Sequence, residues 1–361
     1  MLIHEKRMRG ESMEPNFRRC RILAAIVESY IETGEPVGSK SLVEVLGNCV
    51  SSATIRNDMA ALTAEGYLAQ PHTSAGRLPT PKALRLYVTE LMDRRDLTLQ
   101  DRVDINTALN AVSGDAGRLL EDACRVLADL TGLAVVACRP DGAGSRISRI
   151  EVIQMSPRNM AVMLVQDNGF IRTRMCRCQR DIPSRIATAL TGYMSHHFQG
   201  ADISAVTVEA MQGIMLELGE AGLAVAPILS AFYELAQECD RAKMAVAGQM
   251  NLMRHPEYST ERARALTAFL SERENVQSLL DSLSPDSRVQ VLIGSDDDRV
   301  MGGSCMILAH YSLGQRGQGT IGVLGPNRMN YAEAIPRIEY FAAHFGRMMS
   351  ELFEETAALD V

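Results

Sequence analysis

The chain has 361 residues, more than one ordinary domain needs, so we expect two or three domains. Hydrophobic residues make up 46% and charged residues 22%, which is typical of a globular protein. No apolar run reaches 18 residues, so we expect no membrane span and no membrane partner. The basic N-terminus lacks the apolar core of a secretory signal. These features together predict a cytoplasmic protein.

The charge is unevenly distributed along the chain. The net charge is −7, which by itself disfavours contact with nucleic acid. The first 90 residues, however, carry 11 Lys and Arg against 10 Asp and Glu, whereas the remainder carries 26 against 34. Arg18, Arg19 and Arg21 form a basic run in the first part. A nearly neutral N-terminal part on an acidic remainder is compatible with DNA binding by the N-terminal part.

The pattern over residues 15–90 predicts a winged helix-turn-helix. Apolar residues at helical spacing predict a first helix that stops at Gly34. We expect Ser39 to cap a short second helix, and Ser51 or Ser52 to cap a third. The run "YLAQPHTSAGRLPT" then predicts a strand, a polar loop and a return strand, and the chain resumes as a helix with a proline near its start.

The rest of the chain predicts an α+β domain with a second domain inserted into it. A helical region with a break near Ser113–Gly114 precedes a short buried strand, "LAVVAC". Three apolar runs separated by "PR" and "DNG" then predict a three-stranded antiparallel meander. Sheet partners for "LAVVAC" are expected more than 140 residues later, so the meander and its helices interrupt the first domain. Helices are also expected over residues 183–198, 203–219, 225–239, 260–283 and 331–355.

The third predicted helix has one apolar face and one face of low relief. Ile55, Met59 and Leu62 align at helical spacing and should pack on the first two helices. Alanines on the opposite face would let the backbone approach base edges, while Asn and Arg can bond bidentately to adenine and guanine in the major groove. The residues of this face and its flanks are Ala53, Thr54, Arg56, Asn57, Ala60 and Ala61.

The start of this helix and the loop after it suit contact with phosphate. Free N–H groups at a helix start favour an anion, and Ser51 and Ser52 add hydroxyl donors. The loop holds small polar residues around one guanidinium: His72, Thr73, Ser74, Gly76 and Arg77. A solvated alanine-rich helix is the alternative interpretation. The short second helix, the tight turn and the polar wing favour DNA binding.

Several segments resemble the HrcA family of bacterial heat-inducible transcription repressors. In the first part these are "GEPVGSKSL", "SSATIRNDMAALTAEGYL" and "QPHTSAGRLPT". In the last part, "GQMNLMRHPEY" and "GQGTIGVLGPNRMNYAEAI" are similar to the family's C-terminal blocks. The resemblance covers roughly residues 17–355, so it is not confined to one module.

The resemblance implies a homodimeric repressor of class I heat-shock genes, including the chaperone and chaperonin operons. Such a repressor binds double-stranded DNA at an inverted-repeat operator called CIRCE and is released on heat stress, with the chaperonin as a modulator. It also implies a winged helix, a GAF-like α+β domain and an inserted dimerisation domain. The corresponding limits are 15–90 for the winged helix, 91–145 for the first part of the GAF-like domain with its connecting helix, 146–239 for the inserted domain, and 240–355 for the second part of the GAF-like domain. The expected DNA-binding residues are Ser39, Lys40, Ser51, Ser52, Ala53, Thr54, Arg56, Asn57, His72, Thr73, Ser74 and Arg77.

Two other motifs have plainer interpretations. Gly317, Gly319 and Gly322 spell G-x-G-x-x-G, but the pattern runs into a strand-like segment and not a helix, so we favour a turn with close backbone packing over dinucleotide binding. Arg328 and Tyr331 follow a Gly-Pro turn. For these two residues a sensor pocket, a contact with another subunit and a cap of the last helix stay open, and we favour a structural or interface role.

The sequence lacks a nucleophile elbow, a phosphate-binding loop and an HExxH pattern, so we expect no enzyme and no cofactor. The eight cysteines are dispersed without a CxxC pair, so we expect reduced thiols and no metal site. Two other functions stay open. One is a regulator whose GAF-like domain binds a small-molecule effector, and the other is a winged helix that contacts protein.

Overall fold

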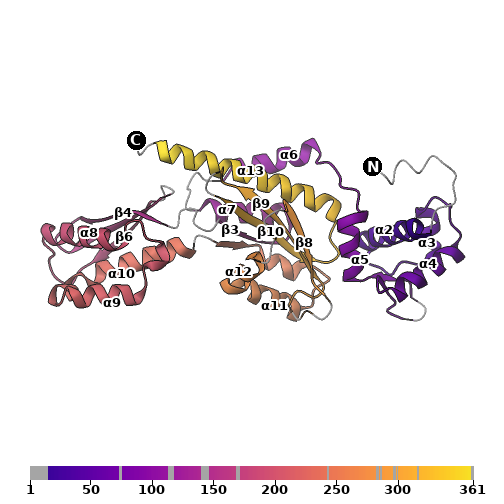
Figure 1. Ribbon diagram of the computed structural model, residues 1–361, viewed down its shortest axis with the longest axis horizontal. Helices are drawn as coiled ribbons and strands as arrows, with labels where there is room; N and C mark the ends of the chain where they lie inside the picture. The colour runs from indigo at the N-terminus through magenta and orange to yellow at the C-terminus, as the bar shows by residue number, and fades with distance from the viewer. Residues whose placement is uncertain are drawn as a thin grey trace.

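The computed structural model has three regions in a row along its longest axis (Figure 1). We call residues 15–91 the head, residues 99–139 and 244–358 the body, and residues 146–241 the insert. The domain limits expected from the sequence stay predictions. The structure describes residues 15–72, 75–112, 118–139, 146–167, 171–241, 244–281, 284, 287–295, 298, 300–314 and 317–358.

The head contains three helices followed by a short β-hairpin, an arrangement consistent with a winged helix-turn-helix. Ile22, Leu42 and Ile55 are fully buried, one from each of the first three helices, and they form the centre of its core. Gly34, at φ +76°, ends the first helix as expected. The elements are α2 (Pro15–Thr33), α3 (Ser39–Val45), α4 (Ser52–Ala64), β1 (Leu68–Ala69), β2 (Leu78–Pro79), α5 (Pro81–Leu86) and a π-helical turn, η2 (Tyr87–Leu91).

The expectation that Ser39 caps the second helix is wrong. Gly38 occupies the N-cap position of α3 without a side-chain cap, and Ser39 is the first helical residue. Its hydroxyl lies 3.1 Å from the hydroxyl of Ser52, so it links the starts of α3 and α4. The third helix is capped as expected, because the Ser51 hydroxyl accepts a hydrogen bond from the Thr54 amide at 3.2 Å.

The body is a five-stranded antiparallel sheet with helices on both faces. The strand order is β7-β3-β10-β9-β8. Side chains alternate across the sheet, so Val135 packs toward α7 and α13, while Val136 packs toward α11 and α12. The elements are α6 (Leu99–Asn110), α7 (Leu119–Thr131), β3 (Ala134–Cys138), β7 (Met244–Ala247), η4 (Gln249–Arg254), α11 (Thr260–Ser271), α12 (Arg273–Asp281), β8 (Val289–Ile293), β9 (Ser304–Ser312), β10 (Gln318–Pro326) and α13 (Tyr331–Ala358).

Three expectations for the body need correction or lie outside the structure. Strand β7 was missed, and its Ala247 pairs with Val135, so only β10 is a partner of β3 at the expected sequence distance. The helix expected over residues 260–283 is divided into α11 and α12 by Glu272, which has extended backbone angles. The expected break at Ser113–Gly114 lies outside the described residues, although a helix is present on each side of it.

The insert contains the expected three-stranded antiparallel meander, in the order β4-β5-β6. One face of this sheet packs on α8 and α10 through side chains such as Val152, Met160 and Val162. The chain leaves the body after β3 and returns as β7, so the meander interrupts the body's sheet in sequence. The elements are β4 (Ile147–Gln154), β5 (Asn159–Gln166), β6 (Ile171–Arg177), α8 (Ser184–Phe198), η3 (Ile203–Ala205), α9 (Val208–Glu217) and α10 (Glu220–Arg241).

The glycines of the G-x-G-x-x-G pattern allow close packing within the body. Gly317 has a left-handed φ of +95° in the turn before β10. A Cβ at Gly319 would lie 2.7 Å from the Cys138 carbonyl oxygen, and one at Gly322 would lie 2.7 Å from the Ile307 carbonyl oxygen. The pattern is therefore a turn that enters a strand, as favoured from the sequence. Within the described residues, no helix combines the length and apolar character that a membrane crossing requires.

Replacing Gly322 with alanine should destabilise the body. The new methyl group would meet the backbone of β9 and the Leu308 side chain, so the strands must move apart, at a cost of about 1–3 kcal/mol. The matched control is Gly192→Ala in α8, where a Cβ would enter open space and the loss of a helical glycine should be neutral or stabilising. Thermal unfolding of both variants measures the difference, and equal midpoints would contradict the packing role of Gly322.

Candidate nucleic-acid interface

Helix α4 has one buried and one exposed face, as expected from its sequence. Ile55, Met59 and Leu62 are buried in the head core, with at most 5% exposed. On the outward face the described side chains are small apart from the amide of Asn57 and the guanidinium of Arg56. Because the alanine side chain is a single methyl group, the helix backbone can closely approach another surface here. Ala53, Arg56, Asn57 and Ala60 are exposed, while Thr54 and Ala61 are partly buried.

The serines near the start of α4 are already bonded within the head. The Ser51 hydroxyl caps the helix and lies 2.9 Å from the Thr54 hydroxyl, and the Ser52 hydroxyl pairs with that of Ser39. Lys40 is exposed on α3. These contacts fix the N-terminal end of α4, whose backbone N–H groups and partial positive charge favour an anion.

Asp58 is a structural residue that was missed in the sequence. It is 4% exposed, and it accepts hydrogen bonds from Arg18 Nε at 2.6 Å and Arg19 Nε at 3.4 Å. Two of the three arginines in the basic run therefore neutralise a carboxylate inside the head. The sequence does indicate this role. Asp58 lies three residues after Ile55 on the buried face, and a buried carboxylate requires a cationic partner.

The arginines change the acidity of this carboxyl group. The hydrogen bond from Arg18 is the largest cause, and together with the charges of Arg18 and Arg19 it lowers the pKa of Asp58, although burial acts in the opposite direction. The ionised form is thus the stable form in the folded head. The ion pair links α2 to α4, so it holds the outward face of α4 in a fixed orientation relative to the first helix.

The wing is attached to the rest of the head at Arg77. The backbone of Arg77 exchanges two hydrogen bonds with Val37, at 2.8 and 2.9 Å, and its Nε donates to the Thr63 hydroxyl of α4 at 3.1 Å. A Cβ at Gly76 would lie 2.5 Å from the Val37 carbonyl oxygen, so glycine allows this close approach. His72 is exposed, whereas Thr73 and Ser74 lie outside the described residues.

The expected residues that the structure describes come from three neighbouring elements of the head. Helix α4 supplies a surface of small side chains with one amide and one guanidinium, α3 supplies the Lys40 ammonium, and the wing supplies the His72 imidazole. In Figure 1, α4 lies on the side of the head that is farther from the body. A duplex could therefore reach this surface without meeting the body.

Replacing Asp58 with asparagine should loosen the head. Arg18 and Arg19 would lose their buried charged partner, which we expect to cost about 2 kcal/mol at neutral pH and to accelerate exchange of the α4 amides roughly thirtyfold. Since the pKa of Asp58 lies below its unfolded value of about 3.9, this stability is present above that value and is lost as the pH falls through the folded pKa. Hydrogen exchange measured by mass spectrometry should show the two proteins converging in acid.

Glu65→Gln is the matched control for this prediction. Glu65 also pairs with Arg19, at 3.2 Å, but its side chain is 47% exposed, so the loss should stay below about 1 kcal/mol. If both variants exchanged at the same rate, the buried pair would have no special role in the head.

The sequence of this chain is similar to those of one family of transcription repressors. Residues 117–335 match the model of a family described as HrcA protein C terminal domain. The heat-inducible transcription repressor HrcA of Geobacter sulfurreducens is 31% identical over 333 residues, which cover 91% of this chain and 96% of that protein. The protein of the same name from Pelotomaculum thermopropionicum is 30% identical over 350 residues, covering 95% and 99%.

A solved structure shows the same fold. A crystal structure described as that of a hypothetical protein, at 2.2 Å resolution, superposes with a TM-score of 0.63 and 23% sequence identity. The match covers 93% of this chain and 98% of the other. The arrangement of head, body and insert is thus not peculiar to this sequence.

Proposed function

Because the chain belongs to the HrcA family of heat-inducible transcription repressors, which are not enzymes, we propose that it represses class I heat-shock operons. These are the operons of the chaperones and the chaperonin. The protein binds their CIRCE inverted repeat as a homodimer and leaves it on heat stress. The observation that carries this proposal is the exposed outward face of α4, on which Arg56 and Asn57 stand among small side chains.

In this proposal α4 lies in the major groove of one half-site. Asn57 bonds to an adenine edge and Arg56 to a guanine edge or a phosphate, while the methyl groups of Ala53 and Thr54 contact thymine methyls. The N-terminal end of α4, Lys40 and the wing contact phosphates and so set the register. His72 and Arg77 act from the wing, and the bond from Arg77 to Thr63 keeps the wing beside α4.

Dimerisation is supported by the second face of the insert's sheet. Its side chains form three rows across the strands, Ile153–Ala161–Met175, Glu151–Met163–Thr173 and Arg149–Val165–Ile171. Ile171 and Met175 are 62% and 57% exposed, which is unusual for apolar side chains on a continuous sheet face. A second copy related by a two-fold axis would cover the same face on both subunits. Two heads joined in this way bind an inverted repeat far more tightly than one head.

Release from DNA on heating requires a change in the position of the two heads relative to each other. We infer that the body and insert hold the heads in a competent geometry at growth temperature and lose it on heating. The 20 methionines of the chain favour adaptable packing in such a structure. Assistance by the chaperonin fits a long chain whose body closes only when segments far apart in sequence pair.

Asn57→Ala should weaken binding to the CIRCE duplex by about 1–3 kcal/mol and leave binding to a scrambled duplex nearly unchanged. The amide reads a base edge, and the scrambled duplex does not present that base in register. Asn110→Ala, at an exposed position at the end of α6, is the control that should change neither affinity. Gel-shift titration on both duplexes measures the effect, and an equal loss on both would refute base reading by Asn57.

Met163→Asp should convert the dimer into a monomer. Met163 lies in the central strand of the insert's sheet, between Glu151 and Thr173, so a carboxylate there would face its own copy across the two-fold axis. The matched control is Met250→Asp on η4, where the methionine is 65% exposed on the body. Sedimentation equilibrium should show a monomer only for the first variant. A variant that stayed dimeric would place the interface elsewhere.

A further inference from the structure

The head is attached to the body by an apolar contact. Val27 of α2, Leu84 of α5 and Tyr87 of η2 lie in the same hydrophobic cluster as the body helices α7 and α13. Burial of these side chains keeps the head attached, although the hydrophobic effect itself is non-directional. Packing of these side chains restricts how the head moves, and polar contacts between head and body add directional restraints to it.

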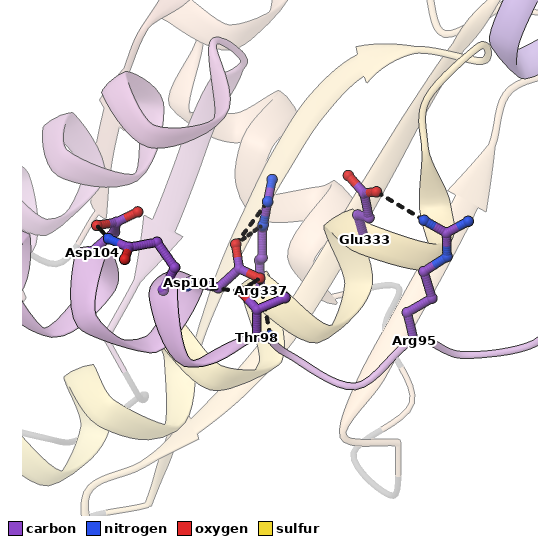
Figure 2. Close-up of polar contacts among 7 residues, drawn as sticks. Arg95, Thr98, Asp101, Asp104, Glu333 and Arg337 are labelled. Atoms are coloured by element: carbon purple, nitrogen blue, oxygen red, sulfur yellow. Dashed lines mark hydrogen bonds and ion pairs between the residues drawn. The ribbon is translucent and has the colours of Figure 1, made fainter.

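The ion pair between the connecting segment and α13 is too exposed to set the angle between head and body, and a second pair near it lies within the body. Figure 2 shows Arg95 beside Glu333 of α13, at 3.1 Å, and Arg337 of α13 beside Asp101 of α6. The Arg95 and Glu333 side chains are 71% and 41% exposed, and pairs of this kind contribute about 0–1 kcal/mol. Arg95 also lies outside any helix or strand, so its pair restrains the segment more than the head.

Arg328 makes a different kind of contact. Its Nε and Nη2 donate to one carboxylate oxygen of Glu257, at 2.9 and 2.7 Å, and both side chains are only about a quarter exposed. Its Nη1 donates to the carbonyl of Ile31, in the last turn of α2, at 3.4 Å. The guanidinium also covers Gly34, where a Cβ would lie 3.0 Å from Nη1.

The end of α2 is suited to this contact. Gly34 ends the helix in a left-handed conformation and leaves room for the guanidinium because it has no side chain. The carbonyls of a helix C-terminus carry partial negative charge, which a cation stabilises. Arg328 precedes α13 and Glu257 precedes α11, so both are held by the body and meet the head from outside.

We propose that Arg328, held by Glu257, is a positioning residue that sets the angle of the head on the body and thereby the half-site spacing that the dimer accepts. This inference rests on the proposed function. A paired guanidinium fixes direction as well as distance. Helix α2 packs on α4, so a tilt of α2 at its C-terminal end moves the DNA-reading surface.

Loss of Arg328 would leave, among the described residues, the directional contact from Arg85 Nη2 of the head to the Ile293 carbonyl of the body, at 2.9 Å. The head could then pivot about that point while its apolar contact persists. The DNA-reading face of α4 would itself be unchanged, because Arg328 contacts the described part of the head at the end of α2. Each head would still bind a half-site, but the two heads of the dimer would no longer require one particular spacing between the half-sites.

The test compares operator spacings. Arg328→Ala and Glu257→Ala are titrated by gel shift against a single half-site, the natural CIRCE repeat, and repeats whose spacer is longer by one or two base pairs. Each added pair rotates one half-site by about 35°. Arg125→Ala is the control, because Arg125 pairs with Glu121 and Asp122 within α7. The ratio of affinities between spacers is the readout, since partial unfolding lowers all affinities equally and cancels from it.

We expect the wild-type protein and Arg125→Ala to lose about tenfold or more on the lengthened repeats. Arg328→Ala and Glu257→Ala should lose less than about threefold on these repeats, with unchanged half-site affinity. If either variant fails to fold, the other still decides the question. Wild-type spacing ratios in the variants would overturn the positioning role alone. A wild-type protein that bound CIRCE and scrambled DNA equally would overturn the proposed function and this inference together.

Discussion

Helix α2 packs on two partners at once, and the rest of the molecule depends on this double packing. Ile22 and Ile26 of this helix belong to the head core, whereas Val27 belongs to the cluster that fills one side of the body. Its first turns hold Asp58 of α4, and its end meets Arg328. A single helix thus joins α4 to the core of the body.

The features that could be predicted from the sequence are those that local periodicity determines. The two faces of α4 follow from the spacing of Ile55, Met59 and Leu62, and the meander follows from alternating runs between turn residues. The outward position of Arg56 and Asn57 needed no knowledge of the partners of α4. Their role in DNA reading stays a prediction, as does the GAF-like character of the body.

The remaining features depend on contacts between distant segments, which periodicity does not report. Strand β7 has only four residues and becomes a strand because β3 offers it a free edge. Ser39 was expected to cap α3, but its hydroxyl turns to Ser52 on the next helix. Arg77 likewise bonds to Thr63, a partner 14 residues earlier that no local pattern indicates.

The insert joins the body between two neighbouring strands of its sheet. Strands β3 and β7 are antiparallel neighbours, and Cys138 and Met244 form the last pair of their register, so the chain departs and returns at adjacent positions. A short reverse turn between these two residues would close an ordinary β-hairpin and leave the five-stranded sheet complete. The sheet of the body is thus topologically whole without the insert, so the insert could be removed or exchanged without changing the strand order of the body.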